Sequence, residues 1–300
     1  MNHKVKSASE YTERSVRLIS DDYLQLIKPG LSMMVVFSSL CAFVIAAGLD
    51  ITLLELSLLA LGGIGVTGGA NAMNQALEAD FDSLMERTKN RPIAAGRVSV
   101  SQGILFAGFM CLIGVTCLAY FNVIAAFFGM LAFMTYAFVY TPLKRYSTVA
   151  VFIGAIAGAM PTLIGVVAFT GSITFLAIGL FLLQFFWQYP HFWAIAFLGY
   201  KDYDKAGYKM IPIKSNSIDR SITSSSIAYG TALILLAAVM MFMQMISPYA
   251  GISLVILGLV LTNLAKEFSD RFDQASAKKL MFGSLLYLPI ALIILIIDQI

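Results

Sequence analysis

The sequence predicts an all-α protein that crosses a membrane several times. Hydrophobic residues make up 59% of the 300-residue chain and charged residues only 12%, a composition typical of a polytopic membrane protein. The apolar residues form runs close to the roughly 20 residues that a helix needs to cross a bilayer. The basic residues fall outside these runs, in alternate connections. Together these observations predict about nine transmembrane helices in one bundle.

The predicted spans follow one another through mostly short connections. They are expected over residues 31–49, 54–76, 100–120, 122–141, 149–169, 173–197, 221–245, 248–265 and 280–297. The third and fourth are nearly continuous, so their separation depends on a turn near Phe121 and Asn122. We expect one membrane-embedded domain over residues 31–300, preceded by a cytoplasmic arm over residues 1–30. Within that arm, Asp21–Lys28 is predicted to form a short amphipathic helix at the membrane surface.

The basic residues also predict the orientation. With this set of spans, all 20 Lys and Arg residues lie on one side of the membrane. Positively charged connections stay in the cytoplasm, so we expect a cytoplasmic N-terminus and an external C-terminus. No cleavable signal peptide is expected, and the apolar setting of Cys41, Cys111 and Cys117 indicates neither a disulfide framework nor a metal site. The net charge of +3 is explained by this topology and requires no nucleic-acid partner.

The connection after the second span carries the most informative motif. Asn74, Glu78 and Asp82 are spaced by four residues, which places them on one face of a helix. Acidic groups near membrane depth are costly and are kept mainly for function. Their oxygens predict a site for a hard divalent cation such as Mg²⁺, and Arg87 and Arg91 could bind an accompanying anion. The simpler interpretation is a solvated loop whose charges lie in water.

A second acidic segment follows the sixth span. It contains Asp202 and Asp204, which would diverge on a helix and could share one ion only on an irregular turn. Lys201 adds positive charge beside them. Taken alone, this segment could be an ordinary polar loop; facing the first motif, it could neutralise a diphosphate through bridging Mg²⁺. Asp80, which lies off the face of the first motif, has no assigned role.

Two further clusters end spans on the same side. Tyr140, Lys144 and Arg145 end the fourth span and could either anchor the helix at the interface or bind phosphate.

The sixth span ends in an aromatic and polar run that contains Gln184, Trp187, Gln188, His191 and Trp193. One interpretation is an interfacial aromatic belt with a hydrogen-bonded histidine. The other is a site for a large flat aromatic ligand, with the histidine touching its metal or a carboxylate.

These motifs together resemble the UbiA-type intramembrane prenyltransferases and, within them, the branch that farnesylates haem. The resemblance covers the chain from about residue 22 to its end. It rests on Asn74-x3-Glu78-x3-Asp82, Arg87-Thr88-x-x-Arg91-Pro92, Tyr140-x3-Lys144-Arg145, Pro190-His191-Phe192-Trp193 and the second acidic segment. It implies a UbiA-like bundle around a central cavity in the bacterial cytoplasmic (inner) membrane, facing the cytoplasm. It also implies farnesyl diphosphate and haem b as substrates, Mg²⁺ as cofactor, and haem A synthase or terminal oxidase assembly downstream.

The same resemblance implies a role for each candidate residue. It assigns metal binding to Asn74, Glu78, Asp82, Asp202 and Asp204, and it assigns a catalytic role to four of these, Asn74, Glu78, Asp82 and Asp202. It assigns diphosphate binding to Arg87, Arg91, Lys144, Arg145 and Lys201. It places Trp187, Gln188, His191, Trp193 and Tyr140 in the haem and prenyl cavity. Two departures affect the metal ligands. Many members have Asp where this chain has Glu78. The family's second motif has aspartates four residues apart, and this chain lacks that spacing. His191 could occupy one of the family's acidic positions.

Three alternatives to this reading differ in chemistry. The acceptor could be a quinone precursor or another aromatic compound. The chain could instead be a transporter for an anionic metabolite, but transporters bury their sites near the midplane, whereas these charges gather at one mouth. A non-catalytic assembly factor that binds haem would have no use for paired acidic and basic loops.

Overall fold

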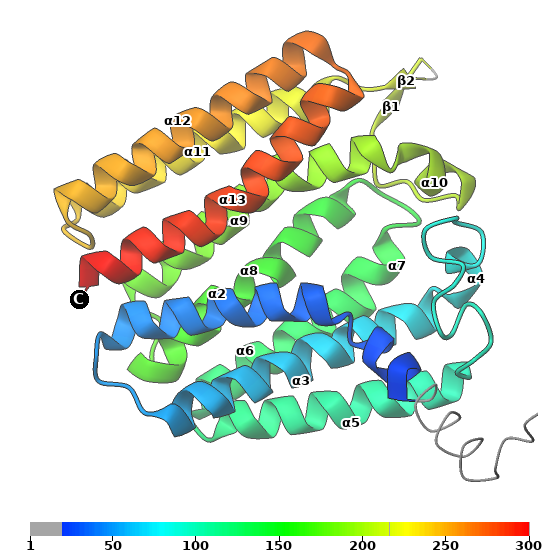
Figure 1. Cartoon of the computed structure of the whole chain (residues 1–300), viewed down its shortest axis with the longest axis horizontal. Coiled ribbons are helices and arrows are strands. Elements are labelled where there is room, and N and C mark those ends of the chain that lie inside the picture. The colour runs from blue at the N-terminus through cyan, green and yellow to red at the C-terminus, as the bar shows by residue number, and fades with distance from the viewer. Residues whose placement is uncertain (1–19, 216, 300) are drawn as a thin grey trace, which may run out of the picture.

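The computed structural model describes residues 20–215 and 217–299, and this part of the chain is almost entirely helical (Figure 1). The long helices are α2 (Pro29–Ala47), α3 (Leu53–Leu77), α5 (Val100–Ala119), α6 (Val123–Met134), α8 (Val149–Thr170), α9 (Phe175–Leu198), α11 (Ser221–Phe242), α12 (Pro248–Arg271) and α13 (Gln274–Gln299). The short elements are α4 (Ala79–Asp82), the π-helix η1 (Thr135–Tyr140), α7 (Thr141–Leu143), α10 (Tyr200–Lys205) and the antiparallel strands β1 (Ile213–Lys214) and β2 (Ser217–Ile218).

The predicted spans agree with the long helices, with one distinction. Among the described residues, eight helices are long and apolar enough to cross a membrane, the fourth being α6, η1 and α7 taken together. The helix that corresponds to the sixth predicted span, α9, has 24 residues and so is long enough. It is not among the eight because Gln184, Gln188 and His191 interrupt its apolar sequence. It therefore stays a predicted ninth span.

The start of the described chain lies where the sequence predicts an amphipathic helix. Residues 20–26 are helical, and Leu26, the last of them, is fully buried. The predictions for residues 1–19, including the basic residues Lys4, Lys6, Arg14 and Arg17, lie outside the described residues.

The helices form two groups joined through α8 and α2. On one side α3 packs on α5, α5 on α6, and α6 on α8, while on the other α9, α11, α12 and α13 pack against one another. Contacts of α2 with α8 and α13, and of α8 with α9, join the two groups (Figure 1). Within its most apolar window α8 is 72% buried, against 28% for α5, α11 and the fourth span, so α8 lies at the centre.

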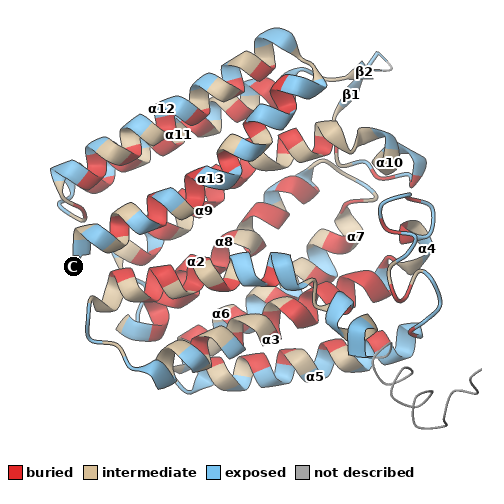
Figure 2. Cartoon of the chain, in the orientation of Figure 1, coloured by how far each residue is buried: buried red, intermediate tan, exposed pale blue. Residues whose placement is uncertain are grey.

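Burial follows the pattern expected of a bundle in lipid. Buried residues line the surfaces between helices, and exposed residues lie on the outer faces (Figure 2). The outer faces are themselves apolar: Leu105 is 74% exposed and Phe242 is 88% exposed. Since lipid tails solvate such side chains as well as a protein core does, the outward faces are suited to a bilayer.

Two local features explain how the helices are placed. A side chain at Gly65 in α3 would put its Cβ 2.6 Å from the Cα of Gly114 in α5, so only glycine permits this close approach. The predicted turn between the third and fourth spans is present, and Asn122 caps α6 by accepting from the Ala125 amide at 2.8 Å. Its side-chain amide also donates to the carbonyl of Val167, at the end of α8.

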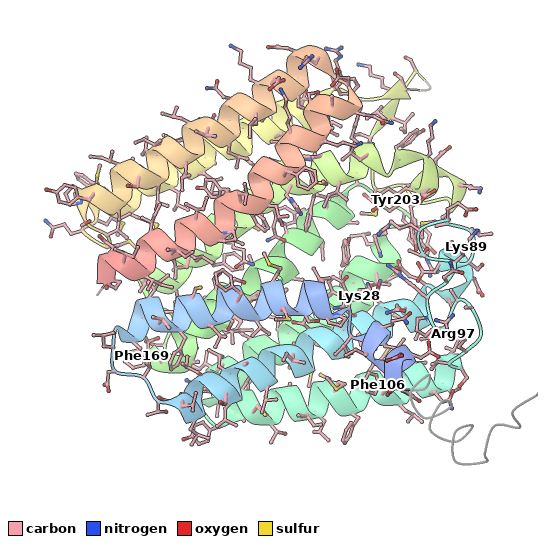
Figure 3. The ribbon with its side chains drawn as sticks, viewed as in Figure 1. Lys28, Lys89, Arg97, Phe106, Phe169 and Tyr203 are labelled. Atoms are coloured by element: carbon pink, nitrogen blue, oxygen red, sulfur yellow. The ribbon has the colours of Figure 1, made fainter. Side chains whose placement is uncertain are left out.

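One end of the bundle collects the polar connections. The elements α4 and α10 and the β1–β2 hairpin all lie there (Figure 1). Figure 3 shows Lys28, Lys89, Arg97 and Tyr203 at this end and Phe169 at the opposite end. We call this the polar end, and it contains the candidate site.

Candidate functional site

The first acidic motif forms the floor of the polar end. The helix α3 ends at Leu77, and α4 begins directly after Glu78. The Glu78 amide donates to the Asn74 carbonyl at 3.0 Å, and the Asp82 amide donates to the Glu78 carbonyl at 2.8 Å. These i to i+4 bonds keep the three side chains on one face, as the sequence predicts. All three residues are at most 2% exposed.

Glu78 is the centre of a buried ion pair. The Lys144 ammonium nitrogen lies 2.6 Å from one Glu78 carboxylate oxygen and 2.7 Å from the other. Asn74 donates its side-chain amide to Glu78 at 2.7 Å and to the Thr141 hydroxyl at 3.1 Å. On its other side Asn74 accepts from the Lys28 ammonium at 3.3 Å. The fourth span thus brings Lys144 to the acidic motif, as the sequence predicts, and α2 brings Lys28.

Asp82 is paired with Arg91. One terminal guanidinium nitrogen of Arg91 lies 2.8 Å and 2.7 Å from the two Asp82 carboxylate oxygens. The Thr88 hydroxyl donates to the Asp82 carbonyl at 2.8 Å and is itself buried. The loop between α4 and α5 therefore turns back on the acidic motif and places a cation there.

The electrostatics of this cluster follow from burial. Burial, together with the nearby charges of Arg91 and Lys144, lowers the pKa of Lys28 to about 7. Burial also lowers the pKa of Lys144, and the adjacent Glu78 carboxylate opposes that shift. Removing ions from water is expensive, and close opposite charges compensate for it only when the geometry is good. The cluster is therefore a set of charges that depend on one another.

Two tyrosines of the connection between α9 and α11 cover the site. Tyr208 is buried, its hydroxyl faces Glu78, and its ring lies 5.5 Å from the Lys144 ammonium. Burial, reinforced by the Glu78 charge, raises the pKa of Tyr208 well above its usual range. Tyr203 packs edge-on against Tyr208 and lies 5.9 Å below the Arg87 guanidinium. The Lys209 amide donates to the Lys144 carbonyl at 2.9 Å, which fastens this connection to the end of the fourth span.

The second acidic segment is more exposed than the first. Asp202 is partly exposed on α10, and Asp204 is exposed and lines a hollow of about 480 Å³ together with Tyr203 and Tyr208. Within the described ranges, no three His, Cys, Asp or Glu side chains gather closely enough to hold a metal ion. Lys201 is exposed on the same helix. Assignment of these residues to a metal and diphosphate site stays a prediction.

Arg145 occupies a different place from Lys144. Its guanidinium donates to the Leu77 carbonyl at 2.7 Å and stacks 3.9 Å from the Phe81 ring centroid. A cation at the end of a helix is favourable because the last carbonyls of α3 are negative. Arg145 therefore fastens the end of α3 to the fourth span, beside the buried cluster and outside it.

The donor set suits Mg²⁺. Two carboxylates and one amide oxygen are hard ligands, and Mg²⁺ is commonly held by one or two carboxylates together with substrate phosphates. One oxygen of Glu78 has no hydrogen-bond partner among the described residues, apart from its ion pair with Lys144. An ion at this position would lie next to Lys144 and Arg91, two cations that could pair with an anion.

An apolar cavity of about 250 Å³ begins next to this cluster. Its lining includes Tyr136 and Tyr140 from the π-helical end of the fourth span, and Lys144 lies 4.9 Å from the Tyr140 ring. The π-helix adds a residue to the turn, a form that is frequent at functional sites. Leu31 and Met34 belong to the lining and are also exposed on the outer surface, so the cavity opens sideways as well.

The sixth predicted span supplies the far wall. Trp187, Gln188 and His191 line the cavity, as the sequence predicts, and the Trp187 and His191 rings stack with centroids 5.1 Å apart. Trp193 does not belong to the lining; its indole donates to the Ser225 hydroxyl of α11 at 3.1 Å. Trp187 and Trp193 are six positions apart on the helix, which turns the second ring to another face.

Sequence reasoning missed several residues of the site. Lys28 was counted only among the basic residues that predict the membrane orientation. Its position directly before Pro29 and Gly30 was nevertheless a signal that the chain turns there. Tyr208 and Thr141 carry no charge and belong to no spaced motif. Nothing in the sequence marks the π-helix.

Comparison with known proteins agrees with this geometry. Residues 35–286 match the UbiA prenyltransferase family. The chain is 37% identical over 285 residues to the protoheme IX farnesyltransferase of Christiangramia forsetii, covering 94% of each chain. It is 38% identical over 281 residues to the protoheme IX farnesyltransferase of Opitutus terrae, covering 93% of this chain and 94% of that one.

Solved structures show the same fold at low identity. Digeranylgeranylglyceryl phosphate synthase aligns with a TM-score of 0.78 at 16% identity, over 93% of this chain and 98% of that one. A UbiA homologue from Archaeoglobus fulgidus bound to GPP and Mg²⁺ aligns with a TM-score of 0.67 at 16% identity, over 91% of this chain and 99% of that one. The full-length match, the shared bundle and the buried acidic motif lead to one conclusion: this chain belongs to the UbiA prenyltransferase family.

Proposed function

We propose that this protein transfers the farnesyl group of farnesyl diphosphate to a vinyl group of haem b and adds water, which yields haem O and diphosphate. It would thus act as a protohaem IX farnesyltransferase, or haem O synthase, and supply haem-copper oxidase maturation. The observation that carries the proposal is the buried cluster of paired acidic and basic residues at the mouth of an apolar cavity. The relatives named above support haem as the acceptor.

The diphosphate would bind at the polar end. Asn74, Glu78 and Asp82 would hold Mg²⁺, which would neutralise diphosphate charge and so improve the leaving group. In the structure Lys144 and Arg91 are paired with Glu78 and Asp82, and a diphosphate offers these cations alternative anions. Such an exchange of partners keeps every buried charge compensated, which is the condition for burying charges at all.

Four other predicted residues have weaker support in this role. Arg87 lies over Tyr203 at the edge of the site, and Lys201 and Asp202 lie on α10. Arg145 is held by the end of α3. We propose that Arg87, Lys201 and Arg145 contribute positive charge near the mouth and that Asp202 contributes to metal binding, while Lys144 and Arg91 make the direct contacts with the diphosphate.

The apolar cavity would take the prenyl chain and the reacting edge of haem. An allylic cation must be kept from bulk water until the vinyl group attacks, and an enclosed apolar lining does this. The Trp187, Tyr136 and Tyr140 rings line the cavity and could stabilise positive charge through their faces. A cavity of about 250 Å³ is too small to enclose both substrates, so part of at least one extends between helices or out through the side opening.

The protein would reside in the bacterial cytoplasmic membrane with the polar end facing the cytoplasm. Its eight candidate spans make it an integral membrane protein. With the predicted spans, the Lys and Arg residues fall on one side of the membrane, which favours a cytoplasmic position for the polar end.

The test is expression in a host that makes haem b and lacks haem O. Mass spectrometry of extracted haem should detect haem O with the wild-type chain. It should detect none, or a small fraction, with the isosteric variant Asp82→Asn, whereas Asp50→Asn, an exposed residue at the opposite end, should leave the yield unchanged. Abundant, folded protein that yields no haem O would contradict the proposal, and prenylation of a quinone precursor instead would replace the acceptor.

A further inference from the structure

Three polar residues form a stripe on the cavity face of α9. Gln184, Gln188 and His191 are spaced by four and three residues, so they lie on one face of the helix, and all three line the cavity. Most of the remaining lining is aliphatic or aromatic. The metal and diphosphate roles proposed above use none of the three. Amide groups buried in an apolar wall need a reason, because an unpaired polar group there is unfavourable.

The two glutamines converge on Gly158 of α8. Gln184 donates its side-chain amide to the Gly158 carbonyl at 2.9 Å, and Gln188 donates its own to the Ala155 carbonyl at 3.0 Å and the Gln184 carbonyl at 3.1 Å. The side-chain oxygen of Gln188 lies over the Cα of Gly158, in space that any Cβ at that position would occupy.

Both amide nitrogens are thus satisfied, whereas the oxygens are not. The side-chain oxygen of Gln184 is fully buried and accepts no hydrogen bond within the described part of the chain. No described residue donates to the side-chain oxygen of Gln188 either. Two unpartnered acceptors one helical turn apart, in an apolar wall, suit a small molecule that can donate hydrogen bonds. Water is such a molecule.

His191 has a defined tautomer. The Ser284 hydroxyl donates its single proton to the Met281 carbonyl at 2.7 Å. It can then only accept from the His191 Nδ1 atom, which lies 2.9 Å away, so Nδ1 carries the ring proton. The Nε2 atom keeps its electron pair.

We propose that Gln184 and Gln188 hold the water molecule that the proposed reaction adds, and that His191 Nε2 accepts its proton. This inference rests on the proposed farnesyl transfer. In that reaction the bond from the farnesyl C1 to the diphosphate oxygen breaks and C1 bonds to the outer vinyl carbon of haem. The inner vinyl carbon becomes cationic. The water oxygen bonds to it, and the proton lost from that oxygen goes to His191.

The geometry explains why hydration would compete with simple proton loss. A water that donates one proton to the glutamine oxygens and the other to His191 Nε2 presents its lone pair to the cavity, where the cation forms. Without it, the same cation would lose a proton from carbon and give a farnesylated haem that lacks the hydroxyl group. The amide pair therefore determines which product forms, in addition to any effect on rate.

The product ratio provides the test. Membranes carrying the wild-type chain, Gln184→Met or Gln188→Met would be supplied with haem b and farnesyl diphosphate, and the haem products separated by liquid chromatography and mass spectrometry. We expect at least a tenfold fall in the ratio of hydroxylated to non-hydroxylated farnesyl haem, the latter being lighter by one water. In water enriched in ¹⁸O, the wild-type product should carry the label in its hydroxyl group.

The chain offers a matched control and a rescue variant. Gln75 is as buried as Gln184, also has an unpartnered side-chain oxygen, and does not line the cavity. Gln75→Met should leave the product ratio unchanged whatever it does to stability. Gln184→Glu should restore the hydroxylated product, because a neutral carboxylic acid offers one donor and one acceptor, as the amide does. His191→Phe should lower the ratio while its ring still fills the wall.

The outcomes separate the two proposals. If the wild-type chain makes no farnesylated haem, the proposed function itself fails. If the wild-type chain makes it and both glutamine variants give the wild-type ratio, the function stands and the water site is wrong. Variants that are present in the membrane but make neither product would assign the glutamines to packing or substrate binding, and would equally overturn the inference.

Discussion

The Lys144 ammonium lies 2.6 Å from the Glu78 carboxylate, and both side chains are at least 90% shielded from solvent. The two residues come from different spans, 66 positions apart in the chain. Breaking a buried pair by removing one partner leaves an uncompensated charge, which costs far more than the net value of the intact pair. The same pair therefore contributes to the stability of the polar end and to its proposed chemistry.

The first prediction concerns this pair. Lys144→Met should lower the free energy of unfolding by about 3–5 kcal/mol, because Glu78 would be left buried and unpaired. Thermal unfolding in detergent would measure the loss. Lys89→Met is the control: its partner Glu86 is 66% exposed at the side chain, so the change should stay within about 0.5 kcal/mol.

A double variant sharpens this prediction. Lys144→Met combined with Glu78→Gln removes both charges and should be more stable than Lys144→Met alone. Equal stability of the single and double variants would mean that the carboxylate is not the source of the loss. Neither variant should support farnesyl transfer, since each removes a proposed ligand.

The second prediction concerns the metal. Chelation of Mg²⁺ should stop the release of diphosphate from farnesyl diphosphate, and added Mg²⁺ should restore it. Asp82→Asn should raise the Mg²⁺ concentration for half-maximal release at least tenfold, which corresponds to about 1.4 kcal/mol of binding free energy. Glu86→Gln, in the same connection but exposed, should leave that concentration unchanged. An equal Mg²⁺ requirement in the wild-type and Asp82→Asn chains would exclude Asp82 as a ligand.

The third prediction separates the ring of Tyr208 from its hydroxyl. The ring is buried beside Phe81 and Lys144, whereas the hydroxyl makes no hydrogen bond that meets normal geometry within the described ranges. Tyr208→Phe should keep the free energy of unfolding within about 1 kcal/mol of wild type. Tyr208→Ala should lower it by about 3–5 kcal/mol. Unfolding curves of the two variants would decide; a similar loss in both would show that the hydroxyl matters more than its contacts indicate.

The fourth prediction concerns the contact of α3 with α5. Gly65→Ala would drive a methyl group into the backbone at Gly114, where no flexible side chain can move aside. We expect a marked fall in the melting temperature or loss of folded protein. Gly108→Ala, on the exposed side of α5 with nothing within 4 Å of the new atom, should stabilise the helix by about 0.5–1 kcal/mol. Size-exclusion and thermal unfolding profiles of the two variants would show the contrast.

The fold could be predicted further than the site. Apolar runs and the distribution of basic residues are properties of the chain itself, so the spans and even the turn at Asn122 were found. The polarity of Gln184 and Gln188 was visible too, but the same residues lower the apolar character by which a span is recognised. The Gln184 amide finds its partner in Gly158 and the Gln188 amide finds one in Ala155, both residues of another helix, and no spacing rule predicts these pairings.

The site residues that were missed share one cause. Periodicity places Asn74, Glu78 and Asp82 on one face because they belong to one stretch of chain. It gives no information about Lys28 or Tyr208, which reach that face from other segments and do so only after the bundle has formed. For the same reason, the spacing alone does not tell whether Asp202 and Asp204 join the first motif; that assignment rests on their charge and on the family resemblance, and it stays a prediction.

The side opening at Leu31 and Met34 has a consequence for how the product leaves the cavity. These two residues belong both to the cavity wall and to the outer surface, so the apolar space inside the bundle is continuous with the surface that faces lipid. A product made more lipophilic by a prenyl tail would diffuse away in the plane of the membrane without crossing water. A downstream enzyme that takes up the product from the same leaflet would need no direct contact with this protein. The product concentration that this enzyme meets would be the number of product molecules per lipid, not per volume of cytoplasm.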